Sequence, residues 1–146
     1  MKIVIQRVSE AKVEVDGRIT GAIGNGLLLL AGFGQNDTEE VVDRATDKIL
    51  KMRIFEDSDG KMNRSVVDLS GELLVVSQFT LYGDTRKGNR PAFTDAMPPD
   101  RAESLYEFMI CQLKSKSSLL VETGVFGAMM SVEMVNRGPV TLIVEM

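Results

Sequence analysis

Two short polar stretches in this chain carry groups that could do chemistry. In VVSQFTLYGD, Ser77, Gln78 and Thr80 place hydroxyl and amide groups where apolar side chains would otherwise continue the core of a strand. In NRGPVT, the Gly138-Pro139 pair interrupts a run of Val, Ile, Leu and Met that is typical of a strand. Such groups can orient a water molecule or a carbonyl group, but none of them is a strong base.

The absence of histidine restricts the chemistry further. With no histidine among its 146 residues, the chain cannot hold a Ser-His-Asp triad, a Cys-His pair or an ordinary His-containing zinc site. Its one cysteine, Cys111, lies in a segment with a helical pattern, which favours a small buried residue over a nucleophile. Any hydrolysis must therefore proceed without imidazole.

The arrangement of the first polar stretch stays open from sequence. Strand alternation places Ser77 and Phe79 on one face and Gln78 and Thr80 on the other. A bulge could bring both pairs into one pocket. The alternative is an edge strand whose polar side chains point to solvent.

Net charge limits the partners that the chain can have. The formal charge of −4 argues against a protein that coats nucleic acid, because such binding depends on Lys and Arg neutralising phosphates, and we expect no DNA partner. A local basic patch remains possible in TRKGNR, where Arg86, Lys87 and Arg90 flank Gly88. A solvated turn is the favoured interpretation of this segment, and a phosphate contact is the alternative.

Two further stretches resemble ligand-binding motifs but lack the residues that such motifs need. GFGQND has Asp37 where the third glycine of a dinucleotide fingerprint would stand, so it is interpreted as a strand end followed by a helix cap. DSDG lacks the remaining oxygen ligands of a calcium loop, so Asp57 and Asp59 are expected to form a turn. We expect neither a metal nor a cofactor.

Strands make up most of the elements that must position these residues. Asp16-Gly17 is typical of a two-residue hairpin turn, a second turn is expected at Asn25-Gly26, and the run LLLLAGFG indicates a strand buried on both faces. The predicted strands cover residues 2–8, 11–15, 19–23, the LLLLAGFG run, 73–76 and two further segments that close the chain.

Two amphipathic helices are predicted as well. The first begins at Asp37, with Glu40 three residues later as in a capping box, and its apolar face is Val41, Ala45, Ile49 and Met52. Pro98-Pro99 opens the second, and its apolar face is Ala102, Leu105, Tyr106, Met109 and Leu113.

The order of these elements predicts the fold class. Strands outnumber helices and do not alternate regularly with them, which favours an α+β fold, a largely antiparallel sheet or barrel flanked by the two helices. The length and the 44% hydrophobic content are those of a single domain spanning residues 1–146. No apolar run approaches the ~20 residues of a membrane span, and the N-terminal stretch lacks the apolar core of a secretory signal, so we expect no membrane partner and a cytoplasmic location.

The two polar stretches together resemble the signature motifs of a known family. SQFTL, from Ser77 to Leu81, and NRGPVT, from Asn136 to Thr141, are similar to the two motifs of the D-aminoacyl-tRNA deacylases. The likeness extends through QRV, GLLLLAG, KILKMRIF, GKMN, RPAF and TGVFGAMM, and therefore covers essentially the whole chain. One departure is Arg137, where the family often carries an acidic residue, and this could tune the approach of the tRNA.

The resemblance implies an activity and an assembly. It implies a cytosolic homodimer that hydrolyses the ester between a D-amino acid and the 3′ end of tRNA, without a cofactor. The Gly138-Pro139 bond would be cis, and each pair would insert into the active site of the partner. Rejection of L-amino acids by this backbone would leave glycyl-tRNA as a side substrate.

The resemblance also assigns roles to individual residues. Chemistry adds that backbone amides near Phe79 and Thr80 could form an oxyanion hole. The Thr80 hydroxyl is the obvious protein nucleophile, but no base is visible to activate it, so orienting water or the carbonyl group is the favoured role and attack is the alternative. The residues implied to bind the terminal adenosine and the aminoacyl group are Ser77, Gln78, Phe79, Phe126, Met129, Asn136, Gly138 and Pro139. For Phe126 and Met129 the alternative is ordinary core packing.

Two other functions remain open on the sequence. The same pocket could belong to a non-catalytic RNA-binding dimer that sequesters charged tRNA ends, or to a general esterase for small amino acid esters. Turnover of a D-aminoacyl-tRNA against its L form separates the first of these from a deacylase, and comparison with a D-amino acid methyl ester separates the second.

Overall fold

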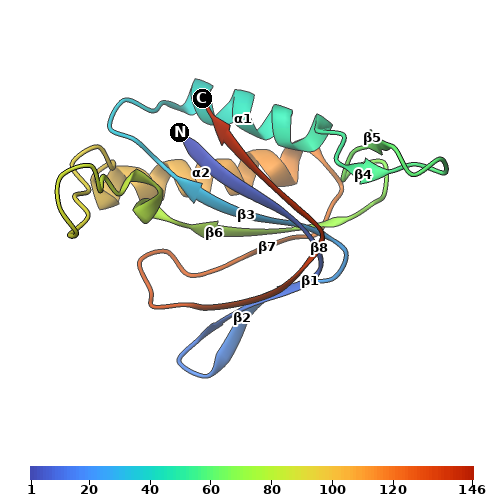
Figure 1. Ribbon diagram of the computed structural model, residues 1–146, viewed down its shortest axis with the longest axis horizontal. Helices are drawn as coiled ribbons and strands as arrows, with labels where there is room; N and C mark the ends of the chain where they lie inside the picture. Colours follow the sequence, from blue (N-terminus) through green and yellow to red (C-terminus); the bar gives the residue numbers. More distant parts are fainter.

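A computed structural model describes residues 1–146, and in it two helices cover one side of a curved sheet (Figure 1). The elements in chain order are β1 (Lys2–Val15), β2 (Arg18–Ile23), β3 (Gly26–Gly32), α1 (Glu39–Lys51), β4 (Phe55–Glu56), β5 (Met62–Arg64), β6 (Glu72–Ser77), the short 3₁₀ helix η1 (Phe79–Tyr82), α2 (Pro99–Lys116), β7 (Val121–Thr123) and β8 (Ser131–Glu145).

The main sheet has six strands in the order β2-β1-β3-β6-β7, with β8 paired to β1. β1 is antiparallel to β2, β3 and β8, whereas the β3-β6 and β6-β7 pairs are parallel. The predicted fold class is confirmed, and the two parallel pairs are an addition to it. They place the C-terminal end of β6 beside the segment that follows β7.

The first strand differs from the prediction of two strands over residues 2–8 and 11–15. β1 is one continuous strand of 14 residues. Its first half, from Lys2 to Val8, pairs with β3, and its second half, from Ala11 to Val15, pairs with β2. The polar residues between the halves mark this change of partner, not an end of the strand.

β3 is buried on both faces, as its apolar run predicted. Leu27 and Leu29 belong to the large core between the sheet and the helices, whereas Leu28 belongs to a second cluster inside the curled sheet. The members of that second cluster are Val8, Ala11, Val13, Ile23, Leu28, Leu74 and Val76.

A glycine brings the two outer strands of the sheet together. A Cβ atom on Gly21 of β2 would lie 2.6 Å from the carbonyl oxygen of Thr123 on β7 and 3.1 Å from Leu74 Cδ1. Only a residue without a side chain allows this approach, which nearly closes the sheet into a barrel.

The beginning of α1 differs from the predicted capping box. The helix starts at Glu39 with Thr38 as its N-cap residue, so Asp37 lies outside it. The Asp37 side chain is buried and accepts hydrogen bonds from the Met1 ammonium group, at 2.6 Å, and from the Gly34 N–H, at 2.6 Å. Burying a carboxylate without hydrogen-bond partners costs more free energy than losing one side-chain cap at a helix end. Asp37 therefore binds the ammonium group and the Gly34 N–H and does not cap the helix.

The buried face of α1 is also rotated from the prediction. Ala45 and Ile49 are buried as expected, whereas Val41 and Met52 are only partly buried at the edge of the core. The buried residues of the helix are Val42, Ala45, Thr46, Ile49 and Leu50.

In α2 the predicted apolar face is confirmed in full, since Ala102, Leu105, Tyr106, Met109 and Leu113 are its buried residues. The predicted burial of Cys111 is wrong, because its side chain is exposed. Each helical residue turns by about 100°, so Cys111, two positions after Met109, points away from the core.

None of the helices combines the length and the apolar character that crossing a membrane requires.

The contact between β2 and β7 gives a test of the barrel. Gly21→Ala should lower the free energy of unfolding by about 1 to 3 kcal/mol, because the added methyl group meets the fixed backbone of Thr123. The matched control is Gly24→Ala, whose Cβ would find its nearest neighbour at 3.7 Å, in the Glu72 side chain. Thermal unfolding should show a melting temperature several degrees lower for the first variant only. Equal melting temperatures for the two variants would mean that the strands do not meet here.

Candidate active site

The strand β6 ends at Ser77, and the chain then turns into the 3₁₀ helix η1. The Gln78 N–H still donates to the carbonyl oxygen of Ala31 on β3, at 2.8 Å, and the Leu81 N–H donates back to the Gln78 carbonyl, at 3.3 Å. The strand alternation expected over Ser77 to Thr80 therefore does not continue past the first of these residues. Instead, the Gln78 side-chain amide donates a hydrogen bond to the Thr80 hydroxyl.

The turn packs directly on the end of β3. A Cβ atom on Gly32 would lie 2.8 Å from the Gln78 carbonyl oxygen and 3.2 Å from Leu81 Cβ, so the glycine makes room for η1. Ser77 and Gln78 are half-buried, whereas Phe79 and Thr80 are exposed. The exposed hydroxyl and the first N–H groups of η1 thus lie at the surface, at one end of the sheet.

The segment after β7 supplies the next two candidate residues. The Gly124 N–H donates to the Val75 carbonyl on β6, at 3.0 Å, which places this segment beside the strand that ends at Ser77. Phe126 is partly buried against the large core, with its ring 5.7 Å from that of Tyr106, so core packing is part of its role. Met129 is 92% exposed and does not belong to the core.

The Gly138-Pro139 pair lies in β8, both residues are exposed, and the bond between them is cis, as expected. Asn136 holds this segment from one side. Its Oδ1 accepts a hydrogen bond from the Val140 N–H, at 2.9 Å, and its Nδ2 donates to the Thr141 hydroxyl, at 2.9 Å. The polar groups of Asn136 are therefore used within β8, and they hold the strand next to the exposed pair.

Arg7 holds the same segment from beneath, and the sequence analysis assigned it no role. Only 8% of the residue is exposed, its Nε donates to the Arg137 carbonyl at 3.0 Å, and its Nη1 donates to the Ile54 carbonyl at 2.8 Å. The Glu56 carboxylate lies 3.6 Å from Nη2. The sequence did contain a signal, because alternation places this arginine on the same face as the fully buried Ile3 and Ile5.

The two polar stretches lie at opposite ends of the sheet within one chain. β8 bulges opposite Arg7, so Gly138 is level with that residue. Arg7 pairs with Leu27 and Leu27 with Leu73, at the start of β6, whereas Ser77 is the last residue of that strand. Four residues of strand span about 13 Å, and the three steps between neighbouring strands from β8 to β6 add about 14 Å sideways.

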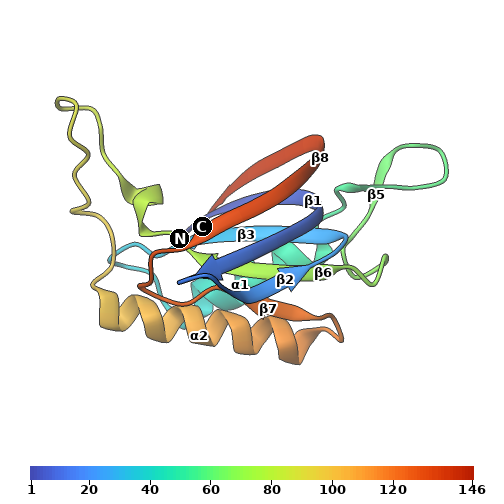
Figure 2. The same cartoon turned by 90° about the horizontal axis from the view of Figure 1, so that it is seen from below.

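β8 also presents an uncovered apolar surface. The strand pairs on one side only, with β1, and Figure 2 shows it at the edge of the sheet. Most of its residues are exposed although many are apolar, and Ile143 reaches 70%. Its exposed large apolar residues are Val132, Met134, Val135, Leu142 and Ile143.

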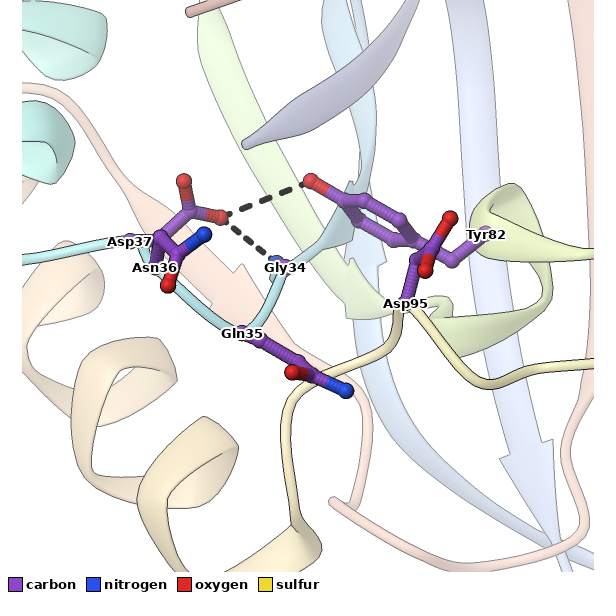
Figure 3. A pocket seen from close by; sticks show the side chains of 6 residues that line it. All are labelled: Gly34, Gln35, Asn36, Asp37, Tyr82 and Asp95. Atoms are coloured by element: carbon purple, nitrogen blue, oxygen red, sulfur yellow. Dashed lines mark hydrogen bonds between the residues drawn. The ribbon is translucent and has the colours of Figure 1, made fainter.

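A pocket of about 270 Å³ lies behind η1, between the loop after β3 and the segment before α2 (Figure 3). The Tyr82 hydroxyl donates to Asp37 Oδ2, at 3.5 Å, and burial together with this carboxylate raises the pKa of Tyr82 to about 12, so the phenol remains a hydrogen-bond donor. None of the predicted site residues lines this pocket. Its lining residues are Gly34, Gln35, Asn36, Asp37, Tyr82 and Asp95.

The segment between η1 and α2 forms an arm that extends away from the body of the molecule (Figure 2). Asp84 and Ala92 exchange backbone hydrogen bonds of 2.7 and 2.9 Å across it. The side chain of Arg86 donates to both carboxylate oxygens of Asp84, at 2.9 and 2.7 Å, and these bonds lower the pKa of Asp84 to about 2. The basic TRKGNR stretch is thus an exposed loop in which one of three cations is paired.

The residues at these sites are not arranged to bind a metal. No group of three or more His, Cys, Asp and Glu side chains is placed to hold an ion. The Asp57 carboxylate instead accepts the N–H groups of Asp59 and Lys61, both at 2.9 Å, as a turn former does.

Comparisons with known proteins agree with the two motifs. The family described as D-Tyr-tRNA(Tyr) deacylase matches residues 4–145. A D-aminoacyl-tRNA deacylase of Koribacter versatilis (strain Ellin345) is 56% identical over 145 residues, which are 99% of this chain and 97% of that protein. The D-aminoacyl-tRNA deacylase of Thermotoga petrophila (strain ATCC BAA-488 / DSM 13995 / JCM 10881 / RKU-1) gives the same identity and coverage, 56%, 99% and 97%.

Solved structures share the fold. A structure described as c-Myc DNA Unwinding Element Binding Protein superposes with a TM-score of 0.95 at 43% identity, over 100% of this chain and 99% of that one. A probable eukaryotic D-amino acid tRNA deacylase gives a TM-score of 0.86 at 17% identity, over 98% and 97%, which supports the fold alone. The family model and the relatives confirm the resemblance seen in SQFTL and NRGPVT: the chain belongs to the D-Tyr-tRNA(Tyr) deacylase family.

Proposed function

We propose that the chain hydrolyses the ester that joins a D-amino acid to the 3′ end of tRNA, and that the Gly138-Pro139 backbone excludes L-amino acids. The observation that carries the proposal is the support of this pair, whose exposed backbone is fixed by the buried guanidinium of Arg7 and by the side chain of Asn136. The relatives named D-aminoacyl-tRNA deacylase support the substrate class.

Hydrolysis of this ester needs little from protein side chains. The ammonium group of the amino acid activates the carbonyl carbon, and the hydroxyl next to the ester on the terminal ribose can pass a proton to the leaving oxygen. The protein holds the ester at η1, where the N–H groups of Phe79 and Thr80 stabilise the oxyanion that forms when water attacks. The Thr80 hydroxyl accepts a hydrogen bond from Gln78, which leaves its own proton free to orient the water or the carbonyl group.

Selection between enantiomers follows from a rigid backbone wall. A D- and an L-amino acid differ by the exchange of a hydrogen atom and a side chain at one carbon. A wall in fixed contact with that carbon accepts the hydrogen atom and rejects the side chain. Because Arg7 and Asn136 hold the wall with hydrogen bonds, it cannot easily withdraw from a wrong substrate.

The separation of the two motifs within one chain supports a site that two copies share. We infer a homodimer in which Gly138-Pro139 of each chain completes the site at Phe79 and Thr80 of the other. The exposed apolar residues of the edge strand β8 support it, because a strand of this length with uncovered Val, Leu, Ile and Met side chains is suited to pairing with another chain. Two-fold symmetry would then build two identical sites.

The first prediction concerns the wall. Glycyl-tRNA has no side chain to collide and should be hydrolysed, whereas L-alanyl-tRNA should be refused. Attraction to a single methyl group is worth only about 1 to 3 kcal/mol, so a larger gap in kcat/KM between these substrates requires a clash. The measurement is deacylation of glycyl-, L-alanyl- and D-alanyl-tRNA. Equal resistance of glycyl- and L-alanyl-tRNA would contradict exclusion by the wall.

The second prediction concerns Thr80. If it only orients the reactants, Thr80→Ala should keep kcat within about tenfold, and the matched variant Thr80→Ser should be closer to wild type. A tRNA ending in 2′-deoxyadenosine should react about 100-fold more slowly or worse, since it lacks the hydroxyl that transfers the proton. Single-turnover kinetics with mass spectrometry of the protein checks both. Detection of an aminoacyl group on Thr80 during turnover would reverse the assignment.

The third prediction concerns the shared site and uses mixed dimers. Thr80→Trp should block the pocket, and Gly138→Ala should displace the wall, because its Cβ would lie 2.9 Å from Arg7 Nη2 and 2.8 Å from Val140 Cγ2. Each variant alone should be inactive. After denaturation and refolding of an equal mixture, half of the dimers should be mixed, each with one intact site, and about a quarter of wild-type activity should return. Failure of the mixture to recover, with a dimeric mass in sedimentation, would place the whole site within one chain.

A further inference from the structure

An exposed aromatic pair lies where the arm meets the candidate site. The rings of Phe79 and Phe93 are 5.0 Å apart in an edge-to-face arrangement, and the two residues are 60% and 37% exposed. Phe93 is seated against the backbone, since a Cβ atom on Gly83 would lie 3.1 Å from its Cε1 atom. The pair is therefore held against the backbone on one side and remains partly exposed to solvent.

Positive charge lies on the same arm. Arg86, Lys87 and Arg90 are all exposed between Asp84 and Ala92, whose backbone hydrogen bonds close the arm into a hairpin-like loop. The Arg86 charge is compensated by Asp84, whereas Lys87 and Arg90 form no ion pair. Two uncompensated cations thus lie on the arm whose base carries the aromatic pair.

The arm is fastened to the body of the protein at its base. The Gln35 N–H donates to the Asp95 carbonyl, at 3.2 Å, and the Met97 N–H donates to the Phe33 carbonyl, at 2.9 Å. The Gln35 side chain also donates to the Thr94 carbonyl. The aromatic pair is therefore positioned relative to η1 by the fold and not by the arm tip alone.

We propose that Phe79 and Phe93, together with Lys87 and Arg90, bind the unpaired nucleotides that precede the terminal adenosine of the substrate. An open aromatic face next to a cationic segment is the surface that single-stranded nucleic acids bind, because each base offers a π face and each linkage a phosphate. A base-paired stem cannot use it, since its bases are already stacked on one another. The inference rests on the proposed function, which brings a tRNA 3′ end to η1.

The surface has two other conceivable occupants, a second copy of this chain and an apolar peptide. An apolar peptide offers the cations no counter-charge, and a second copy offers carboxylates but no free bases for the rings, whereas a single-stranded nucleic acid offers both bases and phosphates. Charge complementarity therefore favours the RNA strand.

The first test compares a long and a short substrate. For Phe93→Leu, the KM for a D-aminoacyl-tRNA divided by the KM for the corresponding D-aminoacyl-adenosine should rise about tenfold, because only the longer substrate has a base to stack. Phe93→Tyr keeps the aromatic ring and should keep the wild-type ratio. The ratio cancels any indirect effect of Phe93 on its neighbour Phe79 within the site.

The outcomes separate this inference from the proposed function. If wild type hydrolyses neither D ester, the deacylase function fails. If both esters react normally and the KM ratio of Phe93→Leu stays at the wild-type value, the stacking surface is wrong. A loss of dimer mass in sedimentation for Phe93→Leu, with restoration in Phe93→Tyr, would show that a second copy occupies the surface and would also overturn the inference.

The second test measures the salt dependence of tRNA binding. Lys87→Gln with Arg90→Gln should reduce the slope of log K against log salt concentration by about 1.4, at about 0.7 for each contact to a single strand. Arg86→Gln is the matched control and should change the slope less, because Asp84 already pairs with that charge. An unchanged slope in the double variant, or an equal change in the control, would return the arm to a solvated loop.

Discussion

The buried guanidinium of Arg7 is the interaction on which the rest of the site depends. It donates to the carbonyl of Arg137 in β8 and to the carbonyl of Ile54 in the segment that leads into β4, so one side chain of β1 joins two distant parts of the chain. A buried cation without partners would be very costly, and the Arg137 and Ile54 carbonyl groups would lose their donor with it. The position of Gly138-Pro139 is thus coupled to the stability of the fold.

A site built in this way uses position more than reactivity. None of the residues proposed to touch the ester is an acid, a base or a metal ligand, and the chain has no imidazole. In the proposed mechanism the reacting groups come from the ester, while the protein supplies backbone N–H groups at η1 and a backbone wall at β8. A mixed sheet can position both groups. Its parallel strands β3 and β6 end together at one end of the sheet, and the long antiparallel pair of β1 and β8 extends to the opposite end.

The sequence predicted those features that depend on neighbouring residues. The buried face of α2, the hairpin turn at Asp16-Gly17 and the two-sided burial of β3 follow from local periodicity and turn chemistry, and all are found. The errors arise where a distant partner decides. Asp37 binds an ammonium group 36 residues away and does not cap the helix. The predicted end of a strand is instead the helix η1, because Gly32 leaves room for it to pack on β3. The candidate site residues came from family resemblance, and the separation of the two motifs along the sheet needed the strand register.

The pairing of β1 with β8 joins the two ends of the chain, from Lys2 opposite Glu145 to Glu14 opposite Ser131. Contacts of such large sequence separation close the longest possible loops, and chains that depend on them fold slowly. During synthesis, β1 can pair with β2 and β3 early, but its other edge stays open until β8 has been made. Until β8 is made, a nascent chain therefore carries an unpaired strand edge, and the segment that holds Gly138-Pro139 joins the fold late.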